Sequence, residues 1–157
     1  MTTVAIEPPR QPEVLGLLRE SDLFHLELYP PESCHLLDVA ELERPGVTFF
    51  VGRHDGTALG TAAILDRGDG TGEIKRMFVS ADARGRGIAR ELLAAVEARA
   101  AALGIHTLQL ETGPLQHAAI ALYERSGYAV IPNFGMYAGD PHSVCMEKSL
   151  TAPPLVE

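Results

Sequence analysis

The spacing of apolar residues in the first third of the chain predicts one short strand followed by helices. The run 4–6 is apolar and is soon followed by two prolines, which is typical of an edge strand. Apolar residues recur at helical spacing over 12–29 and predict one helix or a pair of helices. Two further prolines interrupt this pattern, and Ser33 then stands in a position to cap a second helix. We therefore expect helices over 12–29 and 33–42.

The middle of the chain carries three strand-like runs, 47–53, 59–65 and 73–79. The first two are joined by His54-Asp55-Gly56-Thr57, and Asp-Gly in so short a connector indicates a hairpin. A glycine-rich turn leads into the third run. The three runs therefore predict an antiparallel meander.

A helical pattern follows this meander over 88–103 and is ended by Gly104. The apolar residues expected on its buried face are Ile88, Leu92, Leu93, Val96 and Leu103. The strand-like run 106–111 comes next. Because a helix separates this run from 73–79, we expect the two strands to pair in parallel through a right-handed crossover.

The remaining residues predict a helix over 116–126 and a final pair of strands, 128–131 and 143–150. These elements fit one α+β domain whose mixed, mostly antiparallel sheet is flanked by helices. A length of 157 residues with 46% hydrophobic content suits a single domain with a sizeable core. We assign the domain to 1–150 and interpret 151–157 as a loose, flexible tail.

Charge and cysteine content narrow the functional classes. The formal net charge of −8 argues against a nucleic-acid partner and mildly favours a cationic or amine-bearing ligand. Cys34 and Cys145 fit neither a disulfide scaffold nor a zinc site, so we expect no metal and a reduced, cytoplasmic setting. The sequence has neither a signal-peptide pattern nor an apolar run long enough to cross a bilayer, and we expect no membrane partner.

The stretch Ala83-Arg84-Gly85-Arg86-Gly87-Ile88-Ala89-Arg90 joins a predicted strand to a predicted helix. Such a turn leaves backbone N–H groups free at a helix N-terminus, where the helix dipole adds partial positive charge. The first two arginines add formal charge, and the combination favours a bound phosphate or pyrophosphate. In the competing interpretation, Asp82 caps the helix, the glycines only turn the chain and the arginines are solvated.

Two segments, in characteristic order and separation, resemble the GNAT superfamily of acyl-CoA-dependent N-acyltransferases. Arg84-Gly85-Arg86-Gly87-Ile88-Ala89 matches the family's Arg/Gln-x-x-Gly-x-Gly/Ala signature after a strand. Ala121-Leu122-Tyr123-Glu124-Arg125-Ser126-Gly127-Tyr128 is similar to the family's Leu-Tyr-x-x-x-Gly-Phe/Tyr segment. The resemblance spans 3–150, with its specific motifs within 73–128, and implies a GNAT-like domain with a splayed parallel strand pair.

The resemblance implies that coenzyme A is bound. Backbone amides of the loop residues would hold its pyrophosphate, namely Arg84, Gly85, Arg86, Gly87, Ile88 and Ala89. Met77 and Val79 would offer backbone groups to the pantetheine arm, which lies like an added strand in the splayed pair. The family usually has a β-bulge near Met77. His117 stands where asparagine is frequent in the helix that contacts this arm; a surface histidine at a helix start is the alternative.

The resemblance also implies direct transfer, in which a neutral amine attacks the thioester carbonyl and the departing thiolate takes a proton. Tyr123 stands where the family places its general acid; a core tyrosine is the alternative. Glu73 corresponds by its spacing from Arg84 to the glutamate that is the base in histone-type members; a structural ion pair is the alternative. Further candidates for the base are Glu111, Glu32, His35 and water alone.

In this fold the acceptor site would lie between the segment 29–35 and the late loop 132–141. The residues of that loop with groups to offer a ligand are Phe134, Met136, Tyr137 and Asp140. A loop that only caps the sheet is the alternative. Arg76 is placed either to pair with Glu73 or to meet a carboxylate of the substrate.

We therefore expect a cytoplasmic acetyl-CoA-dependent N-acetyltransferase that acts on a primary amine of a small molecule or peptide. A CoA-binding module without turnover, used in sensing or assembly, is the alternative from another class. A dinucleotide-binding protein of the Rossmann type is disfavoured by the opening meander, because Rossmann units alternate strand and helix from the start. A homodimer is compatible with such a domain, although no residue pattern requires one.

Overall fold

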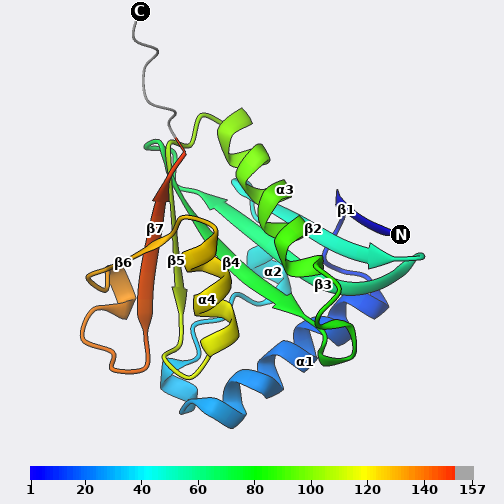
Figure 1. Cartoon of the computed structure of the whole chain (residues 1–157), viewed down its shortest axis with the longest axis horizontal. Helices are drawn as coiled ribbons and strands as arrows, with labels where there is room; N and C mark the ends of the chain where they lie inside the picture. Colours follow the sequence, from blue (N-terminus) through cyan, green and yellow to red (C-terminus); the bar gives the residue numbers. More distant parts are fainter. Residues whose placement is uncertain (151–157) are drawn as a thin grey trace, which may run out of the picture.

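One mixed sheet organises residues 1–150, the part of the chain that the computed structural model describes; the tail predicted for 151–157 lies outside it. The strand order is β1-β2-β3-β4-β5-β7-β6 (Figure 1), and within the described chain only β4 and β5 pair in parallel. This confirms the predicted mostly antiparallel sheet and excludes the Rossmann alternative. The strands are β1 (Thr2–Ile6), β2 (Val47–His54), β3 (Thr57–Asp66), β4 (Thr71–Val79), β5 (Thr107–Thr112), β6 (Ala129–Ile131) and β7 (Val144–Ser149).

Helices cover both faces of the sheet. The helices α1 (Pro12–Leu28) and α2 (Val39–Leu42) pack on one face, and α3 (Ile88–Ala102) and α4 (His117–Arg125) on the other (Figure 1). Successive side chains of β2 point to opposite faces of the sheet: Phe49 packs with α1 and Phe50 packs with α3. Among the helices within residues 1–150, none combines the length and the apolar run needed to span a bilayer.

The strongest local signals of the sequence are confirmed. The turn between β2 and β3 has two central residues, Asp55 and Gly56, with φ of 49° and 87°, as a type I′ hairpin turn requires. The meander of β2, β3 and β4 forms as predicted, and β5 joins it in parallel after α3. The predicted last helix and final strand pair are α4, β6 and β7.

The prediction of a second helix over 33–42 is wrong. Residues 31–33 form a single 3-10 turn, residues 34–38 adopt no regular structure, and only the short α2 follows. Its N-cap is Asp38 rather than Ser33. Asp38 Oδ1 accepts from the Glu41 amide at 2.8 Å, and Glu41 Oε1 accepts from the Asp38 amide at 3.1 Å. This capping box starts the helix six residues later than its expected first residue.

The segment before α2 is bonded to β4 at a β-bulge. The pairing of β3 with β4 shifts after Thr61, opposite Arg76, whose φ is 55°. The bulge lets two successive side chains reach the same segment: Lys75 Nζ donates to the His35 carbonyl at 3.1 Å, and Arg76 Nε donates to the Leu37 carbonyl at 2.8 Å. The two bonds hold this segment against β4. The bulge expected near Met77 is therefore present.

Helix α3 sits closely on the sheet because glycines face it. Gly52 and Gly60 are opposite each other on β2 and β3. A Cβ at Gly60 would lie 2.9 Å from Leu92 Cδ1 and 3.1 Å from the Phe78 carbonyl oxygen. This packing fixes the start of α3 and the loop before it. Leu103, expected on the buried face of the helix, is 37% exposed at its C-cap.

Gly60→Ala is expected to lower the free energy of unfolding by about 1–3 kcal/mol, because the added methyl overpacks the interface between β3 and α3. Gly16→Ala is the matched control: Gly16 lies in α1 with nothing within 4 Å of its added Cβ. That change should instead raise the free energy of unfolding by about 0.5–1 kcal/mol. Chemical denaturation measures both values. A Gly60→Ala protein as stable as the wild type would contradict the close packing of α3 against Gly60.

Candidate active site

The strands β4 and β5 part in the middle of the sheet. They pair only from Thr71 to Ile74 on β4 and from Thr107 to Leu110 on β5, and they diverge beyond that point (Figure 1). The later part of β4 therefore presents unpaired backbone groups toward β5, which suits an added extended chain. Two cavities lie along this gap.

The larger cavity has a volume of about 560 Å³ and lies between the end of β4, the glycine loop and α4. Its lining includes most of the residues predicted to bind the cofactor, namely Met77, Val79, Arg84, Gly85, Gly87, Ile88, Ala89, His117 and Tyr123. Arg86 is the exception. It is exposed to solvent and is not among the residues that line this cavity.

The glycine loop has the geometry of an anion site. Gly85 and Gly87 have φ of 87° and 76°, and a Cβ on either would meet nothing within 4 Å, so conformation rather than crowding requires glycine here. Gly87 is the N-cap of α3 and no side chain caps the helix, which rejects the competing interpretation of Asp82 as its cap. Arg84, Arg90 and Arg125 also line this cavity. Uncapped amides beside guanidinium groups fit a pyrophosphate.

Sequence reasoning missed two aromatic residues of this cavity, Phe24 and Phe78. Phe24 of α1 lines it, and the Arg84 guanidinium carbon lies 5.2 Å from the centre of the Phe24 ring. A signal for it exists, because Phe24 continues the helical stripe through the buried residues Val14, Leu17 and Ser21. The other lining residues not predicted are Ala83, Arg90, Leu115, Gln116, Ala118, Ala119, Leu122 and Arg125.

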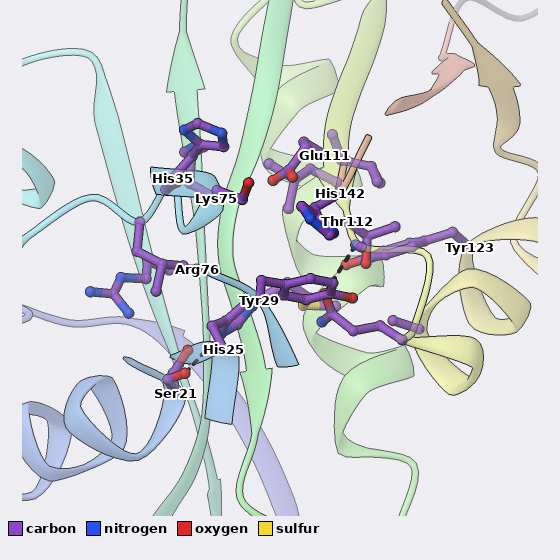
Figure 2. Close-up of a pocket in the computed structure, with 18 residues that line it drawn as sticks. Ser21, His25, Tyr29, His35, Lys75, Arg76, Glu111, Thr112, Tyr123 and His142 are labelled. Carbon is purple, nitrogen blue, oxygen red and sulfur yellow. Dashed lines mark hydrogen bonds between the residues drawn. The ribbon is translucent and has the colours of Figure 1, made fainter. Parts of the chain in front are cut away.

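The smaller pocket, of about 70 Å³, lies on the side of α1 (Figure 2). Ser21, His25 and Tyr29 line it from α1 and its C-cap, whereas Glu111 and Thr112 line it from the end of β5. The two cavities share four lining residues: Met77, Gln116, Ala119 and Tyr123. They therefore meet at Tyr123.

Tyr123 projects from α4 to this junction (Figure 2). Its side chain is buried, and its ring lies edge-on to Tyr128 at 5.7 Å between centroids. Burial, followed by the nearby Glu111 charge, raises the pKa of the Tyr123 hydroxyl well above its ordinary value. The hydroxyl is consequently a neutral proton donor at every physiological pH.

Glu111 lies across the smaller pocket from α1. Its Oε2 accepts a hydrogen bond from Ser143 Oγ at 2.8 Å. Burial raises the pKa of Glu111 from 4.5 to about 7, against the lowering effect of the Ser143 bond. A carboxyl group that titrates near 7 is suited to proton transfer at neutral pH.

Glu73 is a buried residue of β4 itself, and it lines neither cavity. Its carboxylate is held by Arg67 Nη2 at 3.1 Å, by the Tyr137 hydroxyl at 2.6 Å and by Lys75 Nζ at 3.5 Å. Its predicted role as base is therefore not supported by this position. The pairing of Arg76 with Glu73 is wrong: Arg76 Nη1 pairs with Asp22 Oδ1 at 2.7 Å.

Among the other candidates for the base, His35 lines the smaller pocket and Glu32 is exposed outside it. His25, which sequence reasoning did not single out, also lines it. Its Nδ1 lies 2.7 Å from the Ser21 carbonyl, which can only accept, so Nδ1 carries the proton. Burial lowers the pKa of His25 and keeps the ring neutral.

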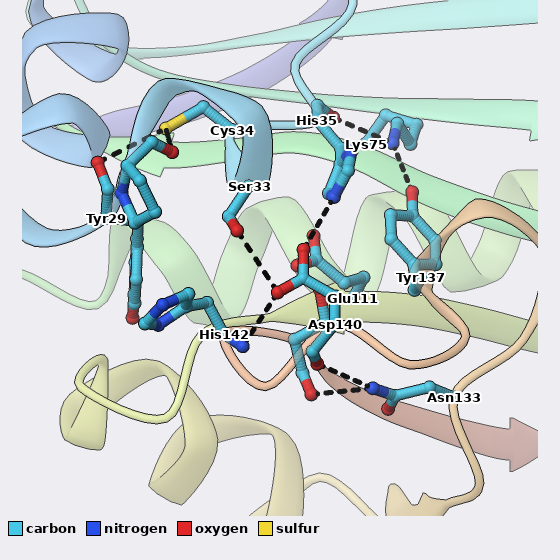
Figure 3. A network of polar contacts seen from close by, with 12 residues as sticks. Tyr29, Ser33, Cys34, His35, Lys75, Glu111, Asn133, Tyr137, Asp140 and His142 are labelled. Carbon is cyan, nitrogen blue, oxygen red and sulfur yellow. Dashed lines mark hydrogen bonds and ion pairs between the residues drawn. The ribbon is translucent and has the colours of Figure 1, made fainter.

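The two segments expected to form the acceptor site do come together (Figure 3). Asp140 Oδ1 accepts from Ser33 Oγ, and Asp140 Oδ2 accepts from His35 Nε2, both at 3.1 Å. The predicted loop residues do not line the smaller pocket themselves: Phe134 lies against Arg67, Tyr137 contacts Glu73, and Met136 is 71% exposed. His142, which was not predicted, lines it instead.

No set of three or more His, Cys, Asp or Glu side chains within residues 1–150 is arranged to hold a metal ion. The Tyr123 phenol lies at the junction, and the Glu111 carboxyl group lines the smaller pocket, as do the rings of His25, His35 and His142. With a phosphate-binding loop at the far end of the larger cavity, the arrangement suits transfer of a group between a nucleotide-bearing donor and a small acceptor.

Comparison with known proteins agrees with this geometry. The sequence profile of the Acetyltransferase (GNAT) family matches residues 14–128. An IAA acetyltransferase of Azospirillum brasilense is 47% identical over 149 residues, or 94% of this chain and 97% of that protein. A solved candidate acyl-CoA N-acyltransferase of Klebsiella pneumoniae superposes with a TM-score of 0.81 at 38% identity, over 96% of this chain and 99% of that chain. An aminoglycoside 6'-N-acetyltransferase complexed with coenzyme A has a TM-score of 0.72 at 18% identity, over 97% and 99%.

Proposed function

Because this chain belongs to the GNAT family of acetyltransferases, and is an acetyl-CoA-dependent N-acetyltransferase, we propose that its acceptor is a primary amine of a small molecule or peptide. The observation that carries this proposal is the position of Tyr123, where the larger cavity meets the smaller pocket. A donor thioester in the first and an amine in the second would meet at its hydroxyl. Membership of an acetyltransferase family also disfavours a CoA-binding module without turnover.

We propose that the larger cavity holds coenzyme A. Amides of the loop 84–89 would bind the pyrophosphate, and the unpaired edge of β4 at Met77 and Val79 would bind the pantetheine arm. His117 and Leu122 of α4 would flank this arm from the opposite wall, because both line the cavity. When bound, acetyl-CoA supplies the activated acetyl group.

In the proposed reaction, Glu111 takes a proton from the amine as the nitrogen bonds to the thioester carbonyl carbon. The carbon–sulfur bond breaks, and Tyr123 gives its hydroxyl proton to the departing sulfur. Solvent or protonated Glu111 then returns a proton to Tyr123. We prefer Glu111 to Glu73 as the base because Glu111 lines the pocket and titrates near 7, whereas Glu73 is enclosed by its ion pairs.

A screen for thiol release tests the function. Purified protein with acetyl-CoA is mixed with alkylamines, amino acids, peptides and IAA, the compound in the name of the 47% identical relative. We expect thiol release with a subset of the primary amines and calorimetric binding of CoA. Binding of CoA with no release from any primary amine would refute the proposed acceptor.

Arg84→Ala is expected to weaken CoA binding about tenfold, because the Arg84 guanidinium lines the cavity and reinforces the anion site. Arg86→Ala is the matched control on the same loop, since Arg86 does not line that cavity, and should change the dissociation constant less than about twofold. Titration calorimetry at two salt concentrations measures both variants. Equal losses in the two variants would contradict this placement of the loop arginines.

Two further proposals concern the setting. The unpaired thiols of Cys34 and Cys145 support a cytoplasmic location, which cell fractionation would test. A homodimer stays a proposal that sedimentation of the purified chain would test.

A further inference from the structure

The smaller pocket has little enclosed space for a ring. Its volume is about 70 Å³, whereas an apolar cavity that holds benzene has about 150 Å³. Polar side chains line much of it, among them His25, Lys75, Glu111 and Thr112. So small a volume suits the end of a slim aliphatic amine better than an aromatic group next to the reacting nitrogen.

One carboxylate holds the wall of this pocket in place. Asp140 accepts hydrogen bonds from Ser33 Oγ at 3.1 Å, from His35 Nε2 at 3.1 Å and from the His142 amide at 2.8 Å (Figure 3). We call these four residues the Asp140 clasp. Ser33, His35 and His142 line the pocket, but Asp140 does not. The carboxylate therefore acts on the pocket through the three residues that it joins.

The clasp joins segments that are distant in the sequence. Ser33 and His35 are more than a hundred residues before Asp140. Asn133 Nδ2 also donates to the Asp140 carbonyl at 3.2 Å and to the Ser143 carbonyl at 2.9 Å, which orders the loop that carries Asp140. Within the described chain no strand pairing connects the two segments, which are joined by these side-chain bonds and by the contact of the Tyr29 and His142 rings.

Lys75 of β4 holds one residue of the clasp, His35, in place. Its Nζ donates to the His35 carbonyl at 3.1 Å and to the Tyr137 hydroxyl at 2.6 Å. The His35 ring also lies edge-on to Tyr137 at 5.1 Å. His35 is thereby fixed at its backbone by β4 and at its ring by Asp140 and the late loop.

We propose that the Asp140 clasp sets the width of the acceptor pocket and so restricts the acceptor to slim aliphatic primary amines. Asp140 is then a positioning residue that determines specificity. This inference rests on the proposed function, because it names the class of amine that the same site accepts.

The test compares unbranched alkylamines with benzylamine and phenethylamine in the full chain. The wild type should favour the alkylamines in kcat/KM by at least about tenfold, and Asp140→Ala should reduce that preference about tenfold, mainly through a lower KM for the aryl amines. The KM for acetyl-CoA should stay within about twofold, because the clasp does not line the larger cavity. Asp140→Asn retains an accepting oxygen for Ser33 and His142, and should keep most of the preference.

Asp69→Ala is the matched control. Asp69 likewise bonds its own loop, through the Thr71 amide at 2.9 Å, but it lies at the turn before β4 and lines neither cavity. Reaction of Cys34 with a thiol reagent gives a readout independent of turnover. Its half-buried Sγ lies 3.6 Å from the Pro30 carbonyl, next to Ser33, and it should react faster in Asp140→Ala.

The outcomes are distinct. A wild type that acetylates none of these amines but acetylates amino acids or peptides refutes this inference alone, whereas one that acetylates no primary amine in the wider screen refutes the proposed function as well. A wild type that acetylates benzylamine as well as the alkylamines refutes the inference alone. The same holds if Asp140→Ala loses activity equally on both classes, because the carboxylate then only stabilises the fold.

Discussion

Tyr123→Phe is expected to lower kcat at least about a hundredfold, because proton transfer from a positioned side chain contributes about 10²–10⁴-fold. The substitution removes one oxygen and keeps the buried ring, which packs against Tyr128. Affinity for CoA should stay within about twofold, since the rest of the larger cavity is unchanged. Steady-state kinetics with a primary amine and calorimetry with CoA measure the two quantities.

Tyr128→Phe is the matched control. Tyr128 is a second buried tyrosine beside the first, but its hydroxyl donates to Glu97 Oε2 at 2.9 Å and it lines neither cavity. Its loss should cost about 1–3 kcal/mol of stability by leaving Glu97 without that donor, with kcat within about twofold. If Tyr123→Phe turned over at the wild-type rate, the phenol would be a core residue and not the acid.

Features determined by neighbours in the sequence were predictable. The Asp55-Gly56 hairpin, the glycine loop before α3 and the parallel return of β5 each depend on a few adjacent residues or on one crossover. The segment before α2 was not predictable in this way. Lys75 bonds the His35 carbonyl from a position 40 residues away, and Arg76, at a bulge, bonds the Leu37 carbonyl of the same segment. No local pattern carries that information.

The site residues also differ in whether adjacent residues in the sequence indicate their role. The loop residues and Tyr123 belong to contiguous motifs, so the sequence located them. Which carboxylate faces the acceptor depends on burial and ion pairing, which is why Glu73 and Glu111 were both open as candidates. His142 enters the pocket wall through a loop that Asp140 ties to the first third of the chain, and nothing adjacent to His142 in the sequence indicates this.

Glu111→Gln is expected to lower kcat about a hundredfold and to change its pH dependence. In the wild type, kcat should fall as the pH decreases through about 7, because protonated Glu111 can no longer accept a proton from the amine. The glutamine variant should lack this acidic limb, while Ser143 still finds an accepting oxygen. Profiles at saturating acetyl-CoA and amine between pH 5.5 and 9 give the comparison. Loss of the limb in Glu73→Gln instead would assign the base to Glu73.

The same substitution has an effect on stability that does not depend on activity. Burial raises the pKa of Glu111 from 4.5 to about 7, so between these pH values the folded protein binds a proton that the unfolded chain has released. The Glu111 contribution to the free energy of unfolding therefore decreases as the pH rises through this window and is constant above it. Glu111→Gln removes this dependence, and the difference in stability from the wild type should move in favour of the variant from pH 4.5 to pH 7. Denaturation at several pH values in the window measures the free energy of unfolding of both proteins. A difference between them that does not change with pH would show that Glu111 is already charged in the folded state, which removes the reason to prefer it as the base.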